Sequence, residues 1–272
     1  DNVSLKDKNA IVLGASTVSG TYAVTAVTDN ITDSGTLAIT GLATFTTSAS
    51  NATITLDETG STFAAGVSLN TTGSSGNATV DTGTNALDIA ASNIGGTLTL
   101  TSGHASGIID SGLVTVGGNL VATTDASSGV ITLDNLAVDG AFTLTPNSAG
   151  AVTIVNDAGL TLAASTMGGT FSGTATIGNI TDTGALAITG TTTLVTSENN
   201  ATITLTDTSN KFGDTGVGRI DLSTQGTTGH VTLVQSDNNG YLDFNASEVR
   251  GNLTVTTGTG GRVRQYGIIT VD

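Results

Sequence analysis

Apolar residues recur at every second position in short stretches along the whole chain. Pairs of apolar residues separated by one small or polar residue come about 9 to 17 residues apart, and Gly, Asn, Asp and Ser fill the gaps. Period two is the spacing of a strand with one buried face, whereas no window shows the spacing of an amphipathic helix. The sequence therefore predicts an all-β protein of many short strands. The pairs are Leu37 and Ile39, Ile54 and Leu56, Val67 and Leu69, Leu87 and Ile89, Leu98 and Leu100, Ile131 and Leu133, and Leu160 and Leu162.

Sequence phrases are copied along the chain. NITDSGTLAITG at 30–41 returns as NITDTGALAITG at 179–190, an offset of 149 residues, and a shorter copy, IIDSGLVTVGG, begins at Ile108. These copies divide the chain into about four imperfect repeats of roughly 75 residues, which is typical of solenoids. A second phrase occurs four times, 73 to 82 residues apart: AIVLGASTVSG from Ala10, ALDIAASNIGG from Ala86, GLTLAASTMGG from Gly159 and YLDFNASEVRG from Tyr241.

The repeat length decides among the architectures that many short strands can form, which are a sandwich, a barrel, a propeller or a β-solenoid. No propeller signature of about 40 to 50 residues is present, whereas a unit of roughly 75 residues divides into about three coils of roughly 20 to 25 residues. We therefore expect residues 1–272 to form a single elongated β-solenoid (parallel β-helix) of roughly 12 coils. Parallel stacking of coils would align Thr, Val and Asn in ladders.

Composition and charge narrow the function. The chain has 55 Thr, 37 Gly, one Pro and no Cys, which suits strands joined by turns and excludes disulfides and thiolate metal sites. Its net charge of −15 repels nucleic acid and anionic lipid. No apolar run approaches the roughly 18 residues that cross a bilayer, so we expect no membrane insertion. The seven basic residues leave positions 9–210 without any, and they are Lys6, Lys8, Lys211, Arg219, Arg250, Arg262 and Arg264.

Residues that could carry chemistry are scattered. His104 and His230 stand alone in different phrases, as turn or surface residues, without a G-x-S-x-G elbow, a P-loop or a zinc motif. Polysaccharide-degrading enzymes with a parallel β-helix fold use clustered carboxylates and a nearby basic residue, whereas the carboxylates here are widely spaced and have no basic neighbour from 9 to 210. We therefore predict no catalytic residue, no cofactor and no enzymatic activity.

Three acids, Asp33, Asp110 and Asp182, share one phrase position. They could form a Ca²⁺ ladder along one edge, or Asx-turns that cap the strands. Copies about three coils apart hold their carboxylates more than about 10 Å from one another, so we favour the turns and predict no metal site.

Two further sets of copied residues have predicted structural roles. Phe45, Phe63, Phe171 and Phe212 are expected to fill the core. The glycines that recur in one phrase position are expected at a corner that needs a positive φ or a close backbone approach. They are Gly20, Gly95, Gly96, Gly168, Gly169 and Gly251.

The phrases SGTLAITG, NATITLD, LDIAASNIGGTLTLT and GALAITGTTTL resemble the repeat regions of filamentous-haemagglutinin-like large bacterial exoproteins and related β-strand-repeat surface proteins. The resemblance covers essentially the whole chain. It implies a right-handed parallel β-helix, secretion to the bacterial cell surface or beyond, and an adhesive or matrix-building role, as in a biofilm. It supplies no catalytic residues. The first residues, DNVSLKDK, lack the apolar stretch of a signal peptide, so a secreted form is expected to be a mature or excised segment.

Two functions fit these observations. The first is a non-enzymatic extracellular structural subunit that stacks head to tail into a filament, with other surface or matrix components as further partners. The alternative is a repeat segment, or stalk, of a large secreted adhesin. In the first case the coil around Val3 to Val12 would meet the coil around Val263 to Val271, because open solenoid ends present unpaired backbone groups. Charged residues at these ends could instead block pairing. The candidate end-to-end interface comprises Lys6, Lys8, Arg250, Arg262, Arg264 and Tyr266.

Overall fold

The computed structural model of the protein describes residues 1–213, 218–236 and 240–272. These residues form strands, turns and bends, and no helix occurs among them. Accordingly, no described segment is a helix long and apolar enough to cross a membrane. Contacts divide the chain into two compact units, unit 1 (Asp1–Gly140) and unit 2 (Ala141–Asp272), and each is described by itself. That residues 1–272 form one elongated domain stays a prediction.

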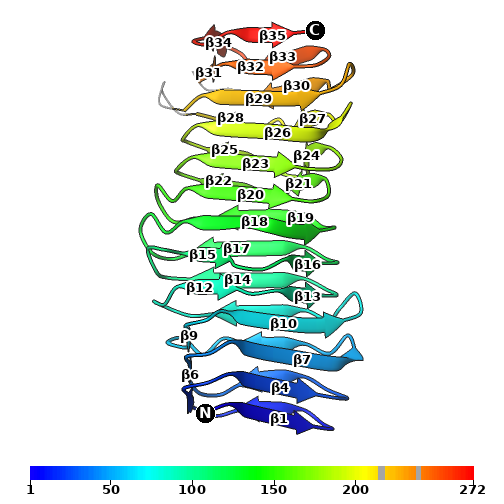
Figure 1. Ribbon diagram of the computed structural model, residues 1–272. Helices are drawn as coiled ribbons and strands as arrows, with labels where there is room; N and C mark the ends of the chain where they lie inside the picture. The colour runs from blue at the N-terminus through cyan, green and yellow to red at the C-terminus, as the bar shows by residue number, and fades with distance from the viewer. Residues whose placement is uncertain (214–217, 237–239) are drawn as a thin grey trace. The chain divides into compact units, whose positions relative to one another are not determined.

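Unit 1 is a stack of coils whose strands pair in parallel with the equivalent strands of the neighbouring coils (Figure 1). Face 1 holds β1 (Val3–Asp7), β4 (Tyr22–Ala26), β7 (Ala43–Ser50), β10 (Val67–Thr72), β12 (Leu87–Ile89), β13 (Ser92–Ile94), β15 (Ile108–Asp110), β16 (Val114–Val116) and β18 (Ile131–Val138). Face 2 holds β2 (Ile11–Leu13), β5 (Ile31–Asp33), β8 (Ile54–Leu56), β11 (Ala78–Asp81), β14 (Leu98–Ser102) and β17 (Leu120–Thr124). Face 3 is short and holds β3 (Ser16–Val18), β6 (Leu37–Ile39) and β9 (Thr62–Phe63).

Unit 2 is built in the same way from parallel pairings of neighbouring coils. Its face 1 holds β20 (Val152–Asn156), β23 (Phe171–Ala175), β26 (Thr192–Asn199), β29 (Ile220–Gln225), β31 (Tyr241–Phe244), β32 (Ser247–Val249), β34 (Arg262–Gln265) and β35 (Ile269–Val271). Its face 2 holds β19 (Ala141–Thr145), β21 (Leu160–Leu162), β24 (Ile180–Asp182), β27 (Ile203–Leu205), β30 (Val231–Gln235) and β33 (Leu253–Thr257). Its face 3 holds β22 (Ser165–Met167), β25 (Leu186–Ile188) and β28 (Lys211–Phe212).

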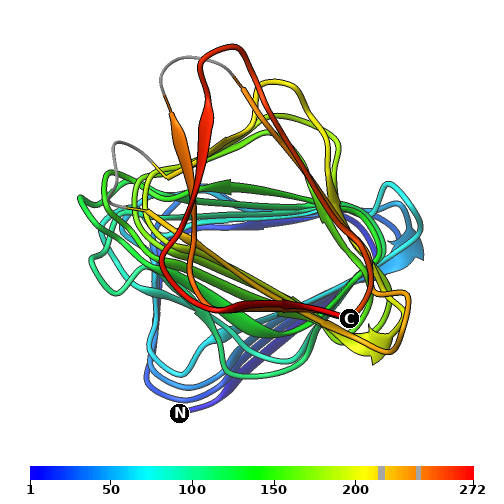
Figure 2. The same ribbon diagram turned by 90° about the horizontal axis from the view of Figure 1, so that it is seen from above.

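Most coils combine one straight strand with one bent pair, meaning two short strands joined at a corner. In the first coil β1 is straight, and β2 and β3 form the bent pair around Gly14 and Ala15. Figure 2 shows the triangular outline that results, and in each unit the chain winds counterclockwise as it comes towards the viewer. A chain that winds in this sense is right-handed. The predicted right-handed parallel β-solenoid is therefore confirmed.

The repeat spans three and a half turns instead of the expected three. Over the described residues of unit 1, the first repeat contains four straight strands and three bent pairs, from β1 to β10. Each straight strand or bent pair is one segment, and successive segments lie on opposite sides of the coil. Because the repeat contains seven segments, an odd number, the next repeat begins on the opposite side. The phrase copy at Ile31 therefore forms β5 on face 2, whereas the copy at Ile108 forms β15 on face 1. The straight strands and the bent pairs change faces at β10 and β11, two straight strands that follow each other.

The inward-facing positions form an aliphatic core with a few aromatic rings. In unit 1 the Phe45 ring lies edge-on to Tyr22 and Phe63, with ring centroids 6.0 and 6.2 Å apart. Phe171 and Phe212 are buried in unit 2, so the predicted core role of these phenylalanines is confirmed.

The recurring glycines lie where the backbone of the coil below leaves no room for a side chain. A Cβ on Gly96 would come within 3.0 Å of the Gly76 carbonyl carbon, and one on Gly169 within 2.7 Å of the Gly150 carbonyl carbon. Gly251 has a φ of +150°. The predicted corner role of these glycines is confirmed, since alanine fits neither situation.

Candidate functional site

The first coil of unit 1 presents part of its core to solvent. β1 pairs in parallel with β4, and the register aligns Leu5 with Val24. Leu5 keeps 40% of its surface exposed, whereas Val24 keeps 1%. Alternation in the sequence VSLKD turns Leu5 inward, so its exposure marks an uncovered layer of the core.

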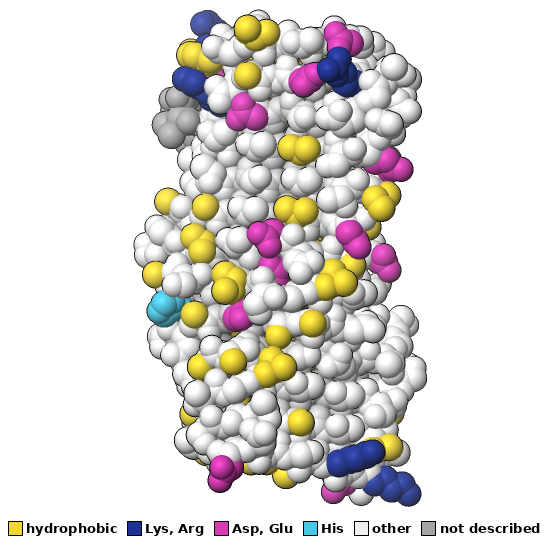
Figure 3. Space-filling view, viewed as in Figure 1, with side chains coloured by type: hydrophobic (Ala, Val, Ile, Leu, Met, Phe, Trp, Pro, Cys, Tyr) yellow, Lys and Arg dark blue, Asp and Glu magenta, His cyan; other side chains and the backbone are white. Residues whose placement is uncertain are grey.

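Lys6 and Lys8 accompany this open layer. Lys6 is aligned with Thr25 and, by alternation, points away from the core. Lys8 follows β1, and its carbonyl accepts the Thr28 N–H at 2.9 Å. Both lysines are exposed. In Figure 3 the dark blue basic side chains gather over the first coil of unit 1 and over the last coils of unit 2.

The last coil of unit 2 is open in the same way. β34 pairs with β31, and the register aligns Val263 with Leu242. Val263 is 53% exposed, whereas Leu242 is 0% exposed. Val271 on β35 is half exposed, and its partner in register, Val249 on β32, is buried.

Arg264 is held by unit 2 itself. Its Nε donates to Asp243 Oδ1 and its Nη2 to Asp243 Oδ2, both at 2.6 Å. Asp243 is only 1% exposed, and the hydrogen bonds to its carboxylate raise the pKa of the Arg264 guanidinium. The guanidinium carbon also lies 3.6 Å from the centre of the Tyr241 ring. Arg264 therefore neutralises a buried carboxylate and is not free to bind a neighbouring molecule.

The other predicted interface residues of unit 2 divide into engaged and exposed side chains. Arg250 forms ion pairs with Glu248 and Asp272. Tyr266 is half exposed, and the guanidinium carbon of Arg219 lies 4.2 Å from its ring centre. Arg262 is exposed at the start of β34. Of these three predicted residues, Arg262 and the free side of Tyr266 remain accessible.

The three copied acids cap corners of the following coil. Asp33 Oδ1 accepts the Asp57 N–H, and Asp110 accepts the N–H groups of Asp134 and Asn135, each at 3.0 Å. Asp182 does the same for Thr206 and Asp207 at 2.9 and 3.0 Å. The predicted Asx-turn, in which the carboxylate accepts an N–H from its own turn, is therefore wrong. Each carboxylate instead accepts N–H groups of the next coil.

Two of the capping carboxylates, those of Asp33 and Asp110, are partly desolvated. Burial is the main cause that raises the pKa of Asp33 and of Asp110, against the lowering effect of the backbone N–H groups that they accept. The charge of Asp57 adds to the rise at Asp33, and that of Asp134 adds to the rise at Asp110. Asp33 and Asp110 therefore accept backbone hydrogen bonds at corners where their carboxylates are partly shielded from water.

Asparagines at a neighbouring corner act in the same way. Asn30 Oδ1 accepts the Thr53 N–H at 2.7 Å, and its copy Asn179 accepts the Thr202 N–H at 2.7 Å. At the equivalent place in unit 2, His230 Nδ1 accepts the Asn252 N–H at 2.9 Å. His104 accepts the Ser106 N–H in an exposed turn, so both histidines lie in turns at the surface, as predicted.

Within the described residues, His, Asp and Glu side chains do not gather in threes in a way that would hold a metal ion. The Arg264–Asp243 pair is the feature that sequence reasoning missed. A signal was present, because Asp88 and Asp243 both place a carboxylate between the two apolar residues of the phrases ALDIAAS and YLDFNAS.

Stacked parallel coils and corner caps that recur from coil to coil define a β-solenoid repeat protein. The chain belongs to the family described as Repeats of unknown function (DUF5649), whose model matches residues 1–70, 75–147, 149–217 and 218–272. The four matches agree with the four repeats expected from the copied phrases. No curated protein and no solved structure gives a match to the chain.

Proposed function

We propose that this protein is a non-enzymatic structural subunit that stacks head to tail into a filament at the bacterial cell surface or in the extracellular matrix. The observation that carries this proposal is the parallel, in-register pairing of equivalent strands from coil to coil, which a further coil of the same kind can extend. Leu5 and Val263 are 40% and 53% exposed, whereas their register partners Val24 and Leu242 are 1% and 0% exposed. A further coil placed on each end would bury these layers as inner coils do.

The order of segments allows a second copy to supply that further coil. The last coil of unit 2 is the straight strand β33 followed by the bent pair β34 and β35, and the first coil of unit 1 is the straight strand β1 followed by the bent pair β2 and β3. A second copy can therefore place β1 over β33 and its bent pair over β34 and β35. Leu5 would then lie over Val255. Such a contact is heterologous, so it generates an open filament when its rotation does not close.

Apolar and backbone contacts would supply most of this association. Arg264 is engaged with Asp243, and Arg250 with Glu248 and Asp272, so these groups have little charge left for a neighbour. Of the basic residues in the predicted interface, Lys6, Lys8 and Arg262 remain exposed. They lie beside the open layers. Because exposed ion pairs contribute only about 0 to 1 kcal/mol, these residues would affect how two copies align more than how tightly they bind.

A repeat segment, or stalk, of a larger secreted adhesin is the second candidate. The observation that favours it is the tiling of the chain by four family matches, from residue 1 to residue 272. In this case coils of the same polypeptide would cover the open layers, and the 272-residue chain would show no preference for binding a second copy.

Sedimentation velocity and electron microscopy of the 272-residue chain separate the two candidates. Filament formation predicts concentration-dependent growth into thin fibres. Leu5→Lys should abolish that growth, because it places a charge in the layer to be buried. Ser4→Lys is the matched control, since Ser4 lies next to it on the outward side of β1 and should leave assembly intact. Monomers that persist at high concentration would rule out the filament and leave the stalk.

A further inference from the structure

Asp88 and Asp243 occupy the same place in a copied phrase. Asp88 lies between buried Leu87 and Ile89 on β12, and Asp243 lies between buried Leu242 and Phe244 on β31. Each strand is the first half of a bent pair on face 1 of its unit. By alternation, both carboxylates stand on the outer side of the strand. Unit 2 therefore shows which partner a carboxylate at this position binds.

That partner in unit 2 is a guanidinium from the next coil. The register aligns Asp243 with Arg264, and two hydrogen bonds of 2.6 Å join them in a side-by-side arrangement. Planar, bidentate pairing of this type is stronger and more specific than a single hydrogen bond.

Asp88 in unit 1 has no such partner. The register aligns it with Ile109 on β15, a residue that cannot donate a hydrogen bond. Within the described residues, Asp88 Oδ1 is buried without a hydrogen-bond partner. A buried acceptor left in this state is unfavourable, and more so when it is charged.

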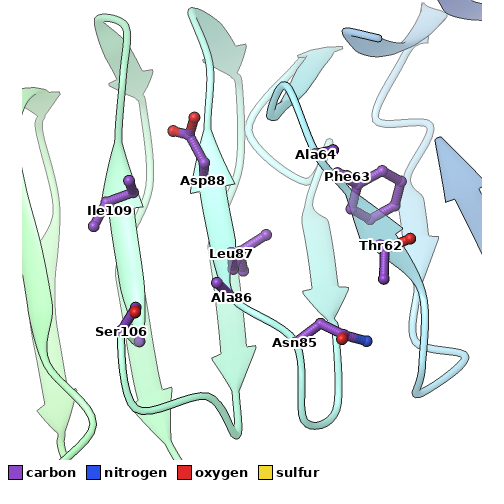
Figure 4. Close-up of a pocket in the computed structure, with 10 residues that line it drawn as sticks. Thr62, Phe63, Ala64, Asn85, Ala86, Leu87, Asp88, Ser106 and Ile109 are labelled. Atoms are coloured by element: carbon purple, nitrogen blue, oxygen red, sulfur yellow. The ribbon is translucent and has the colours of Figure 1, made fainter. Parts of the chain in front are cut away.

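A pocket opens beside this carboxylate. Its volume is about 370 Å³, and its lining includes Phe63, Leu87, Asp88 and Ile109. Figure 4 shows Asp88 on β12 between Ile109 on one neighbouring strand and the segment of Phe63 and Ala64 on the other side. The volume lies near the lower end of the range of about 300 to 1,000 Å³ for ligand sites.

The change of face between repeats accounts for the pocket. Face 3 of unit 1 ends at β9, because after β10 and β11 the bent pairs form on face 1 as β12 with β13 and β15 with β16. No strand of unit 1 therefore continues face 3 beyond β9 among the described residues. The notch between β9 and β12 is the place where Asp88 stands.

We propose that this pocket binds the guanidinium group of an arginine side chain from a partner polypeptide, with the Asp88 carboxylate as its hydrogen-bond acceptor. Charge favours this occupant, because the chain has a net charge of −15 and no Lys or Arg between positions 9 and 210. Ile109, which is 43% exposed, offers an apolar surface at this pocket that suits the methylene stem of arginine. The site shares no residue with the open end layers, so it stands or falls separately from the filament.

Methyl NMR of the 272-residue chain at physiological salt tests the site. The probe is the peptide acetyl-Gly-Arg-Gly-amide, compared with its lysine and citrulline analogues. Citrulline has nearly the shape of arginine but carries no charge. The arginine peptide should shift the Ile109 and Leu87 methyl signals saturably, the lysine peptide more weakly, and the citrulline peptide not at all. Equal shifts with arginine and citrulline, or no shift at these methyls, would overturn the proposal.

Two substitutions complete the test. Asp88→Asn should weaken binding of the arginine peptide by about tenfold to a hundredfold, whereas Asp139→Asn, which removes one exposed charge of unit 1, should not. Equal weakening by both would show a general charge effect and refute the site. Ile109→Arg should fill the pocket from within, raise the melting temperature and abolish peptide binding. An Ile109→Arg protein that binds the peptide as the parent does would also refute it.

Discussion

Arg264 Nε and Nη2 each lie 2.6 Å from a carboxylate oxygen of Asp243, so one guanidinium spans both oxygens of an acid that is only 1% exposed. Replacing Arg264 with Met would leave the Asp243 charge buried without compensation. We expect Arg264→Met to lower the melting temperature clearly in a thermal scan followed by circular dichroism. Arg262→Met, two residues away and exposed, is the control and should change it little. Equal melting temperatures for the two variants would contradict the structural role of the pair.

The glycine corner of unit 1 gives a second prediction. A Cβ on Gly118 would come within 2.7 Å of the Gly96 carbonyl carbon, so Gly118→Ala forces neighbouring coils apart. Overpacking of this kind costs about 1 to 3 kcal/mol of unfolding free energy, measurable by urea denaturation. A Cβ on Gly14 would meet nothing within 4 Å, so Gly14→Ala should be neutral or slightly stabilising. If both variants unfold at the same urea concentration, close approach is not what selects glycine at 118.

The asparagine cap between coils gives a third prediction. Asn30 Oδ1 accepts the Thr53 N–H at 2.7 Å, and Asn30→Ala leaves that donor without its acceptor. We expect a loss of about 1 kcal/mol in unfolding free energy. Asn93→Ala on the outward side of β13 is a suitable control, because Asn93 is exposed and faces solvent. A cost at Asn93 as large as that at Asn30 would argue against capping as the reason.

Acid pH should increase the contribution of Asp110 to the stability of the folded protein. Burial raises the pKa of Asp110 above its ordinary value of 3.8, so the folded protein takes up a proton on this group before the unfolded chain does. The contribution of Asp110 to stability should therefore rise as the pH falls from 7 through its raised pKa, and it should be complete below 3.8. The difference in unfolding free energy between the parent and Asp110→Asn should grow in favour of the parent over this range. A difference that shrinks towards acid pH would show that the pKa is lowered.

Much of the fold could be predicted from the sequence because alternation and copying are local properties of the chain. The apolar pairs, such as Ile54 and Leu56, lie inward as expected, and the copied phrases mark the coils. The number of turns in a repeat could not be predicted in this way. Ile31 and Ile108 carry the same phrase, yet the structure places them on different faces, because spacing along the chain does not count the corners between them.

The site was harder to predict because it depends on which residues lie above one another. Arg264 reads in the sequence as a charge at an open edge, and only the register with Asp243 shows that it is engaged. Asp33 reads as a local turn residue for the same reason, since its partner Asp57 lies 24 positions further along the chain. Contacts between coils have no fixed sequence separation, because coil lengths vary from 19 residues (Val3 to Tyr22) to 28 (Ile203 to Val231).

The half turn in each repeat has a consequence for how such a chain can grow. A gene duplication that adds one repeat exchanges the roles of the two main faces for everything that follows, so every outward-facing residue changes sides. A duplication that adds two repeats restores the original orientation, and surface features survive unchanged. Selection on the surface would then treat the pair of repeats as the unit of inheritance. The sequence has the pattern that such selection would produce. NITDSGTLAITG is copied closely after 149 residues, two repeats away, whereas the copy one repeat away, IIDSGLVTVGG, is less similar.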